Sequence, residues 1–206
     1  MDLQLFHIFR NTPLGRETLL QSLYFCNNVG ASPLIYIPRH TKFLMYFDND
    51  VVQIDLDNSY LTAPATAVEH ATELVEAAGL KTRFYEPKNF TATTLPDITT
   101  KFDFMCSPRS ISDLSSKIGL GYIGPRVRRI VKSACFPVLI TSPVYKPWNS
   151  ITVFFGGSNN AVNALRLGCR ICRATGMTLN MFTQVDKGRR REDYEKIIDK
   201  NDLGAD

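Results

Sequence analysis

Short apolar runs alternate with longer amphipathic stretches along this chain. The apolar runs near residues 5–9, 34–37, 82–85, 102–106 and 138–140 have the length of buried β-strands. Residues 14–29 and 65–78 carry apolar side chains at helical spacing, and these stretches stop at Gly30 and Gly79. Strands that alternate with helices predict a parallel α/β sheet with right-handed crossovers.

The segment Gly119–Ile140 combines a glycine-rich turn, a short basic helix and a strand that we expect to be buried on both faces. Gly124 is suited to cap the helix, and Pro125 to its first position. Apolar residues take one face of this helix, while Arg126, Arg128, Arg129 and Lys132 take the other. A glycine loop before a helix N-terminus can bind an anion. Alternatively, Gly121 and Gly124 only shape a turn, and the basic side chains face solvent.

Residues 43–56 predict a hairpin around Asp48-Asn49-Asp50. Asp48, Asp50, Asp55 and Asp57 cluster there, but their spacing lacks the glycine and the bidentate glutamate of a calcium loop. Turn chemistry and protection of an edge strand account for these carboxylates, so no metal site is predicted.

The beginning of the chain recurs near its end. A proline-containing stretch leads into a second strand, helix and strand, in which aligned residues lie 146 positions after their counterparts: Phe9 and Phe155, Leu19 and Leu165, Cys26 and Cys172, Gly30 and Gly176. This register predicts a duplicated α/β unit. We therefore expect a domain at 1–142, a linker at 143–150 and a partial second copy at 151–206. Half a sheet leaves apolar side chains uncovered, which predicts burial by the first copy or by a partner chain in a homodimer.

Composition excludes several functions. The net charge of +4 is mild, and the basic run at 187–191 is balanced by nearby carboxylates, without interleaved aromatic residues. We therefore expect no nucleic-acid partner. No apolar run approaches the length needed to span a bilayer, and the N-terminus lacks a signal-peptide pattern, so we expect a cytoplasmic protein without a membrane partner. Five cysteines are an odd number and lie mostly inside apolar runs, which is typical of buried free thiols in a reducing compartment.

Few residues suggest catalysis. Cys169 and Cys172 form a Cys-x-x-Cys pair without a second ligand pair, which favours core packing over zinc or redox chemistry. Gly156-Gly157-Ser158 follows a strand and begins a helix, so it is either a ligand-approach turn or a helix cap. His7, His40 and His70 have no partner visible in the sequence. We assign no catalytic residue.

Residues 1–142 resemble a universal stress protein domain, and residues 151–206 resemble the first third of another. The resemblance rests on Ile151–Ser158, on Phe102–Cys106, and on the spacing from Gly124 to the strand that starts with Pro137 and Val138. It implies a Rossmann-like sheet of the adenine nucleotide alpha hydrolase type, with five parallel strands. It also implies dimerisation and, in one branch of the family, ATP bound at a Gly-x2-Gly-x9-Gly-(Ser/Thr) loop beside an aspartate that ends the first strand.

This chain departs from that nucleotide motif at most positions. Pro108 and Ile111 match the first two glycines, and Pro125 replaces the hydroxyl residue. Arg10 and Gly156 match the aspartate in the two copies. These residues remove amide donors or prevent close backbone approach to phosphate. We therefore expect no cofactor, and Gly121, Gly124, Arg126, Gly156, Gly157 and Ser158 are vestiges of a binding site.

The leading hypothesis is thus a non-catalytic universal stress-type protein that acts in stress response or regulation through protein association. The alternative is a switch that binds ATP or AMP weakly, or a slow ATP hydrolase, with a rearranged loop at Gly121–Arg129. A nucleotidyl-transfer or electron-transfer enzyme would need a histidine-bearing or flavin-contacting loop, and the sequence has no such motif.

Overall fold

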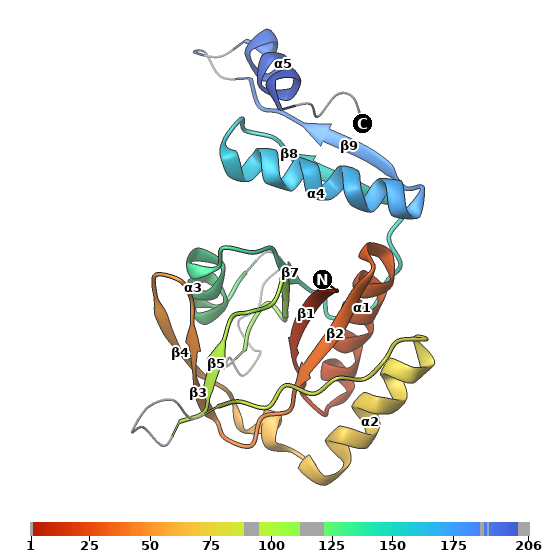
Figure 1. Ribbon diagram of the computed structural model, residues 1–206, viewed down its shortest axis with the longest axis vertical. Helices are drawn as coiled ribbons and strands as arrows, with labels where there is room; N and C mark the ends of the chain where they lie inside the picture. Colours follow the sequence, from red (N-terminus) through yellow and green to blue (C-terminus); the bar gives the residue numbers. More distant parts are fainter. Residues whose placement is uncertain (1, 89–94, 112–121, 186–187, 189, 202–206) are drawn as a thin grey trace. The chain divides into compact units, whose positions relative to one another are not determined.

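The computed structural model describes residues 2–88, 95–111, 122–185, 188 and 190–201. The chain divides into two compact units, Met1–Lys146 and Pro147–Asp206. Figure 1 shows the elements of each unit. No described helix has both the length and the apolar character needed to cross a membrane.

The first unit is built on a four-stranded parallel sheet with the strand order β2-β1-β6-β7. Its strands are β1 (Leu3–Ile8), β2 (Ala31–Tyr36), β6 (Phe104–Ser107) and β7 (Val138–Ile140). The expectation of five parallel strands is corrected here. The segment that we predicted as the remaining strand forms only an isolated bridge, from Phe84 to Ile35 of β2.

The pleat of β1 sends alternate side chains into two apolar layers. Leu19 and Leu23 of α1 (Pro13–Val29) pack with residues of α2 (Pro64–Ala77) on one side. Phe6 and Ile8 face the other layer, which contains a second, smaller sheet with the order β4-β3-β5. In Figure 1, α1 and α2 lie on one side of β1 and β2, and β3, β4 and α3 lie on the other.

The smaller sheet begins with the predicted hairpin, β3 (Lys42–Tyr46) and β4 (Val51–Asp55), whose strands pair antiparallel. A short 3-10 helix, η1 (Asn58–Leu61), follows the hairpin. The third strand, β5 (Asp97–Thr99), pairs parallel with β3. Helix α3 (Pro125–Ser133) buries Val127 and Ile130 in the same apolar layer.

Two expectations about burial, of strand β7 and of the cysteines, need correction. Strand β7 is half-buried along its whole length, because it is the edge strand of the four-stranded sheet and not a strand covered on both faces. All five cysteines are free thiols, but only Cys26 and Cys106 are buried, and Cys135 is exposed.

The second unit contains β8 (Ser150–Phe154), α4 (Asn159–Thr175), β9 (Thr178–Phe182) and α5 (Arg191–Lys200). Strands β8 and β9 pair parallel. Helix α4 begins and ends 146 positions after α1. Strand β8 likewise ends 146 positions after β1, and β9 ends 146 positions after β2. Gly30 and Gly176 both end their helices with positive φ, 67° and 70°.

Candidate functional site

Three neighbouring parallel strands of the first unit end at one small cavity. Segments that follow the carboxyl ends of β1, β6 and β7 supply most of its wall, and the first turns of α1 together with Tyr60 of η1 supply the rest. Open α/β sheets bind their ligands at this edge. The cavity has a volume of about 90 Å³. Its described lining residues are Arg10, Leu14, Gly15, Thr18, Tyr60, Pro108, Arg109, Ser110, Thr141, Ser142 and Pro143.

Arg10 stands at the end of β1, where the family resemblance implies an aspartate. Its guanidinium lies over the ring of Tyr60, 5.4 Å from the centroid, and its Nη2 lies 3.7 Å from a carboxylate oxygen of Asp57. That carboxylate also accepts a hydrogen bond of 2.8 Å from the backbone N–H of Ser59, at the start of η1. The Arg10 Nε atom is buried and has no hydrogen-bond partner. The first strand therefore presents a cation to the cavity.

Gly15 lets α1 start close to Arg10. A Cβ atom at position 15 would lie 1.8 Å from the carbonyl oxygen of Arg10, so only glycine fits there. The N–H of Gly15 donates to the hydroxyl of Thr12, the N-cap of α1, over 3.1 Å. The turn between β1 and α1 is therefore closed by protein groups.

The start of α3 is also occupied by protein groups. Gly124 caps α3 without a side-chain hydrogen bond, and its N–H donates to the carbonyl oxygen of Arg109 over 2.8 Å. Ile111 is almost fully buried in the apolar layer, and Pro108 lines the cavity. Gly121 lies outside the described residues. The Gly124 amide is thus committed to the segment after β6.

The basic side chains of α3 pair with carboxylates of the hairpin. Arg126 donates to Asp55 over 3.1 Å, and Arg129 lies 3.6 Å from Asp50. A hydrogen bond from Ser133 lowers the pKa of Asp50, against a smaller opposing effect of burial, and the charge of Arg129 lowers it further. Burial raises the pKa of Asp55, but hydrogen bonds from Gln53 and Arg126 outweigh it and lower the pKa overall. The sequence pattern assigned Asp50 and Asp55 to turn chemistry. In the structure these two aspartates also pair with the basic side chains Arg129 and Arg126 of α3.

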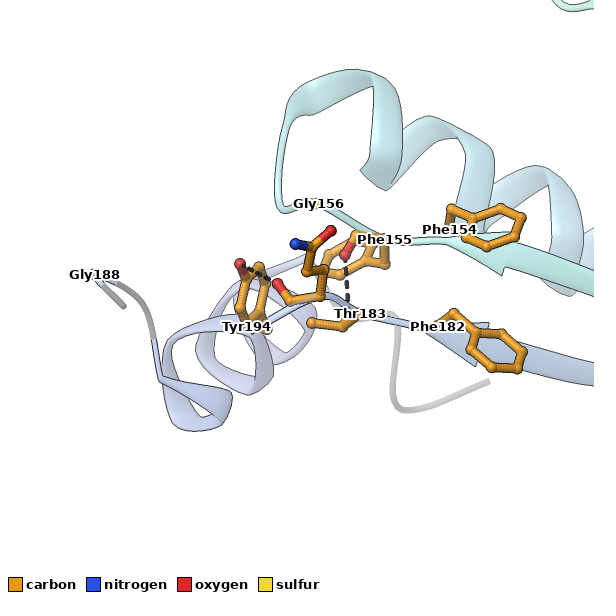
Figure 2. A pocket seen from close by; sticks show the side chains of 8 residues that line it. Phe154, Phe155, Gly156, Phe182, Thr183, Gly188 and Tyr194 are labelled. Atoms are coloured by element: carbon orange, nitrogen blue, oxygen red, sulfur yellow. Dashed lines mark hydrogen bonds between the residues drawn. The ribbon is translucent and has the colours of Figure 1, made fainter. Parts of the chain in front are cut away.

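The second unit has a larger hollow of about 920 Å³ where β8 and β9 end. Figure 2 shows the side chains that line it, including Phe155, Thr183 and Tyr194. The hydroxyl of Thr183 donates to the Phe155 carbonyl oxygen over 2.9 Å, and that of Tyr194 donates to the Gln184 carbonyl over 3.2 Å. None of the described lining residues is charged, so this hollow offers no cation from them to a phosphate group.

Gly156, Gly157 and Ser158 join β8 to α4 beside this hollow. Gly156 lines it, and Gly157 has a positive φ of 73°, which glycine adopts without strain. The hydroxyl of Ser158 caps α4 by accepting from the N–H of Ala161 over 3.2 Å. Ser158 therefore has a structural role in the helix start.

A buried polar cluster behind the cavity was missed by sequence reasoning. The Nδ1 atom of His7 lies 2.8 Å from the hydroxyl of Ser22, which itself donates to the carbonyl oxygen of Thr18. Burial lowers the pKa of His7 to about 3 and raises the pKa of Cys106 to about 12. A neutral imidazole and a protonated thiol that are both almost fully covered cannot reach a substrate. We assign this cluster to the core.

His70 belongs to a second polar group, on the surface of α2. Its Nδ1 lies 2.8 Å from Nη2 of Arg16 and 3.0 Å from Oδ1 of Asn11. Asn11 also donates to the backbone carbonyl of Ala63 and to the hydroxyl of Thr66. These bonds connect the turn after β1 to the start of α2, so their evident role is to position α2.

Neither a family model nor a curated protein matches the sequence. The fold of the chain is similar to that of a solved structure, a universal stress protein from Archaeoglobus fulgidus DSM 4304, with a TM-score of 0.63 and 15% sequence identity. The match covers 98% of this chain and 74% of that one. At this identity the likeness concerns the fold. The chain therefore has the α/β fold of a universal stress protein, built here on a four-stranded parallel sheet.

Proposed function

We propose that this chain is a non-catalytic universal stress-type protein that acts in stress response or regulation through protein association. In this proposal it is a tandem protein: the first unit is one stress-protein domain, and the second unit is a partial copy. The matching bounds of α1 and α4 support the duplication. So do the paired caps, Thr12 with Ser158 and Gly30 with Gly176.

The observation that carries the proposal is the state of the crevice at the ends of β1, β6 and β7. Small-molecule pockets in proteins have volumes of roughly 300–1,000 Å³. The cavity here, at about 90 Å³, is too small for a nucleoside. Arg10 also replaces the carboxylate acceptor that the family resemblance implies, so the end of β1 offers a hydrogen-bond donor where that family has an acceptor.

The alternative, a nucleotide switch at Gly121–Arg129, receives less support. It requires cations at the start of α3 to neutralise phosphate, but Arg126 and Arg129 lie against Asp55 and Asp50. The N–H of Gly124 donates to the Arg109 carbonyl oxygen. A nucleotide at this position would have to displace each of these protein contacts.

The uncovered face of the second unit supports association. Helix α4 packs on the side of β8 and β9 that carries Val153, together with Ile151 and Leu179. Side chains of a strand alternate between its faces, so the opposite face carries Phe154 and Phe182, which pair in register. Their rings lie 6.0 Å apart, and they are 80% and 60% exposed. We name this surface the Phe154–Phe182 face (Figure 2).

We propose a second copy of the chain as the partner at this face. Its six members are uncharged: Ser150, Thr152, Phe154, Thr178, Asn180 and Phe182. A charged face would repel its own copy, whereas a neutral face with two aromatic rings is compatible with itself in a symmetric dimer. Burial of two exposed aromatic side chains per copy also favours contact.

Size-exclusion chromatography with light scattering tests this association. We expect the wild-type chain to elute as a dimer and the Phe154→Ser, Phe182→Ser double variant to elute as a monomer. Val144→Ser is the matched control, because Val144 is an exposed apolar residue of the first unit. A monomeric wild-type chain, or a double variant that remains dimeric, would contradict the proposal.

A further inference from the structure

We propose that the cavity at the ends of β1, β6 and β7 is a site for a small tetrahedral oxyanion, such as inorganic phosphate or sulfate. This site is distinct from the α3 start, where the glycine pattern had predicted anion binding. It also does not depend on self-association of the chain. The argument rests on the charge, the unpartnered polar atoms and the size of the cavity.

The charge of the cavity is positive. Arg10 and Arg109 line it from the ends of β1 and β6, and none of its described lining residues is an aspartate or a glutamate. Asp57 lies 3.7 Å from Arg10 and partly neutralises it, but this carboxylate also accepts from the N–H of Ser59. The described lining residues therefore carry a net positive charge. Guanidinium groups match the geometry of oxyanions and bind them through charge-assisted hydrogen bonds.

Two residues that line this cavity each have a buried polar atom without a hydrogen-bond partner. Thr141 follows β7 and is only 3% exposed, and its hydroxyl oxygen makes no hydrogen bond. Its backbone N–H donates to the carbonyl oxygen of Ser107, so the residue is fixed in place. The Nε atom of Arg10 is the other. A buried donor without a partner is costly, and a ligand that accepts from both groups removes that cost.

The first turn of α1 adds to the same field. Leu14 and Gly15 line the cavity at the N-terminus of this 17-residue helix. The N–H of Gly15 donates to Thr12, so α1 contributes the partial positive charge of its N-terminus, which favours anions, and not this N–H as a donor. The first turn of α1, the two arginines and Thr141 thus line one cavity from four chain segments.

Size decides which anion fits. At about 90 Å³ the cavity has room for more than one water molecule, which needs ~10–15 Å³ of such space. This is the size class of a phosphate or sulfate ion and is well below that of a nucleoside phosphate. The cavity therefore selects a free oxyanion over the phosphoryl group of a nucleotide.

The experiment is calorimetric titration of the full chain with inorganic phosphate, sulfate and AMP in separate arms, at constant ionic strength set with sodium chloride. We expect phosphate and sulfate to bind and AMP to give no heat. Thr141→Val keeps the shape of the side chain and removes its hydroxyl, so we expect it to weaken phosphate binding at least tenfold. Arg10→Gln should weaken it further.

Arg128→Gln is the control, because Arg128 contacts the Ile123 carbonyl and the Tyr122 ring rather than the cavity. Equal phosphate affinity in wild type and Thr141→Val would overturn the site. If titration with phosphate gives no more heat than titration with sodium chloride, the cavity holds water alone, and the oxyanion site is refuted. If AMP binds more tightly than phosphate, the size argument is wrong, and so is the claim that the nucleotide site is lost. If phosphate does not bind and AMP does not bind either, only the oxyanion site is refuted, and the proposed function stands.

Discussion

His7 makes the stability of this protein depend on pH. Its imidazole is fully buried in β1, contacts Ser22 through Nδ1, and leaves Nε2 without a partner. Burial lowers its pKa to about 3 from an ordinary value of 6.5. Between these two values the unfolded chain binds a proton at His7 and the folded chain does not. The free energy of unfolding therefore falls as the pH is lowered from 6.5 towards 3.

The magnitude follows from the two pKa values. At pH 5 the unfolded imidazole lies about 1.5 pH units below its pKa, while the folded one remains neutral. One unit corresponds to about 1.4 kcal/mol, so His7 alone lowers the free energy of unfolding by about 2 kcal/mol between pH 7.5 and pH 5. The carboxylates of Asp50 and Asp55 have lowered pKa values, so their contribution is lost only as the pH falls below about 4.

Urea unfolding at pH 7.5 and pH 5 measures this difference, in wild type and in His7→Leu. The leucine variant leaves Ser22 with its hydrogen bond to the Thr18 carbonyl, so no new polar group is stranded. We expect the wild type to lose about 2 kcal/mol between the two pH values and the variant to lose much less. His40→Gln removes an exposed imidazole and is the matched control. If the free energy of unfolding still falls by about 2 kcal/mol between the two pH values in His7→Leu, or no longer falls in His40→Gln, the reasoning is refuted.

Two further predictions concern the contacts that shape the first unit. Gly15→Ala should lower the free energy of unfolding in urea by about 3 kcal/mol, because the new Cβ would overlap the Arg10 carbonyl oxygen. Gly156→Ala is the control and should be close to neutral, because a Cβ atom there meets no atom within 4 Å. A fully stable Gly15→Ala protein would contradict the close approach. In a double-mutant cycle, Arg126→Ala and Asp55→Ala should show a coupling of about 0.5 kcal/mol that weakens in salt, as expected for a partly exposed ion pair; a coupling of zero at low salt would contradict the pairing.

The helices and the hairpin could be predicted from local signals. Periodic apolar positions, a hydroxyl cap and a glycine stop are sufficient to define α1 and α4 to within a residue or two. The asparagine–aspartate turn between two apolar runs was sufficient for β3 and β4. These features depend on neighbours in sequence, so a sequence pattern can reveal them.

Features that depend on distant residues could not be predicted in this way. Strand β5 has only three residues, too few for a periodic pattern, and exists because it pairs with β3. The ion pair between Arg126 and Asp55 joins residues 71 positions apart. No sequence spacing indicates that the aspartates of the hairpin neutralise the basic face of α3. The small cavity was hidden for the same reason, because its wall is assembled from the ends of three strands.

The central claim is that the crevice at the carboxyl edge of the sheet has lost the space and the acceptor groups for a nucleotide. Calorimetric titration of the wild-type chain with ATP, ADP and AMP tests it most directly. The account predicts no saturable heat with any of the three at millimolar concentration. Micromolar affinity for one of them, lost on substitution of Gly124 by valine, would contradict it.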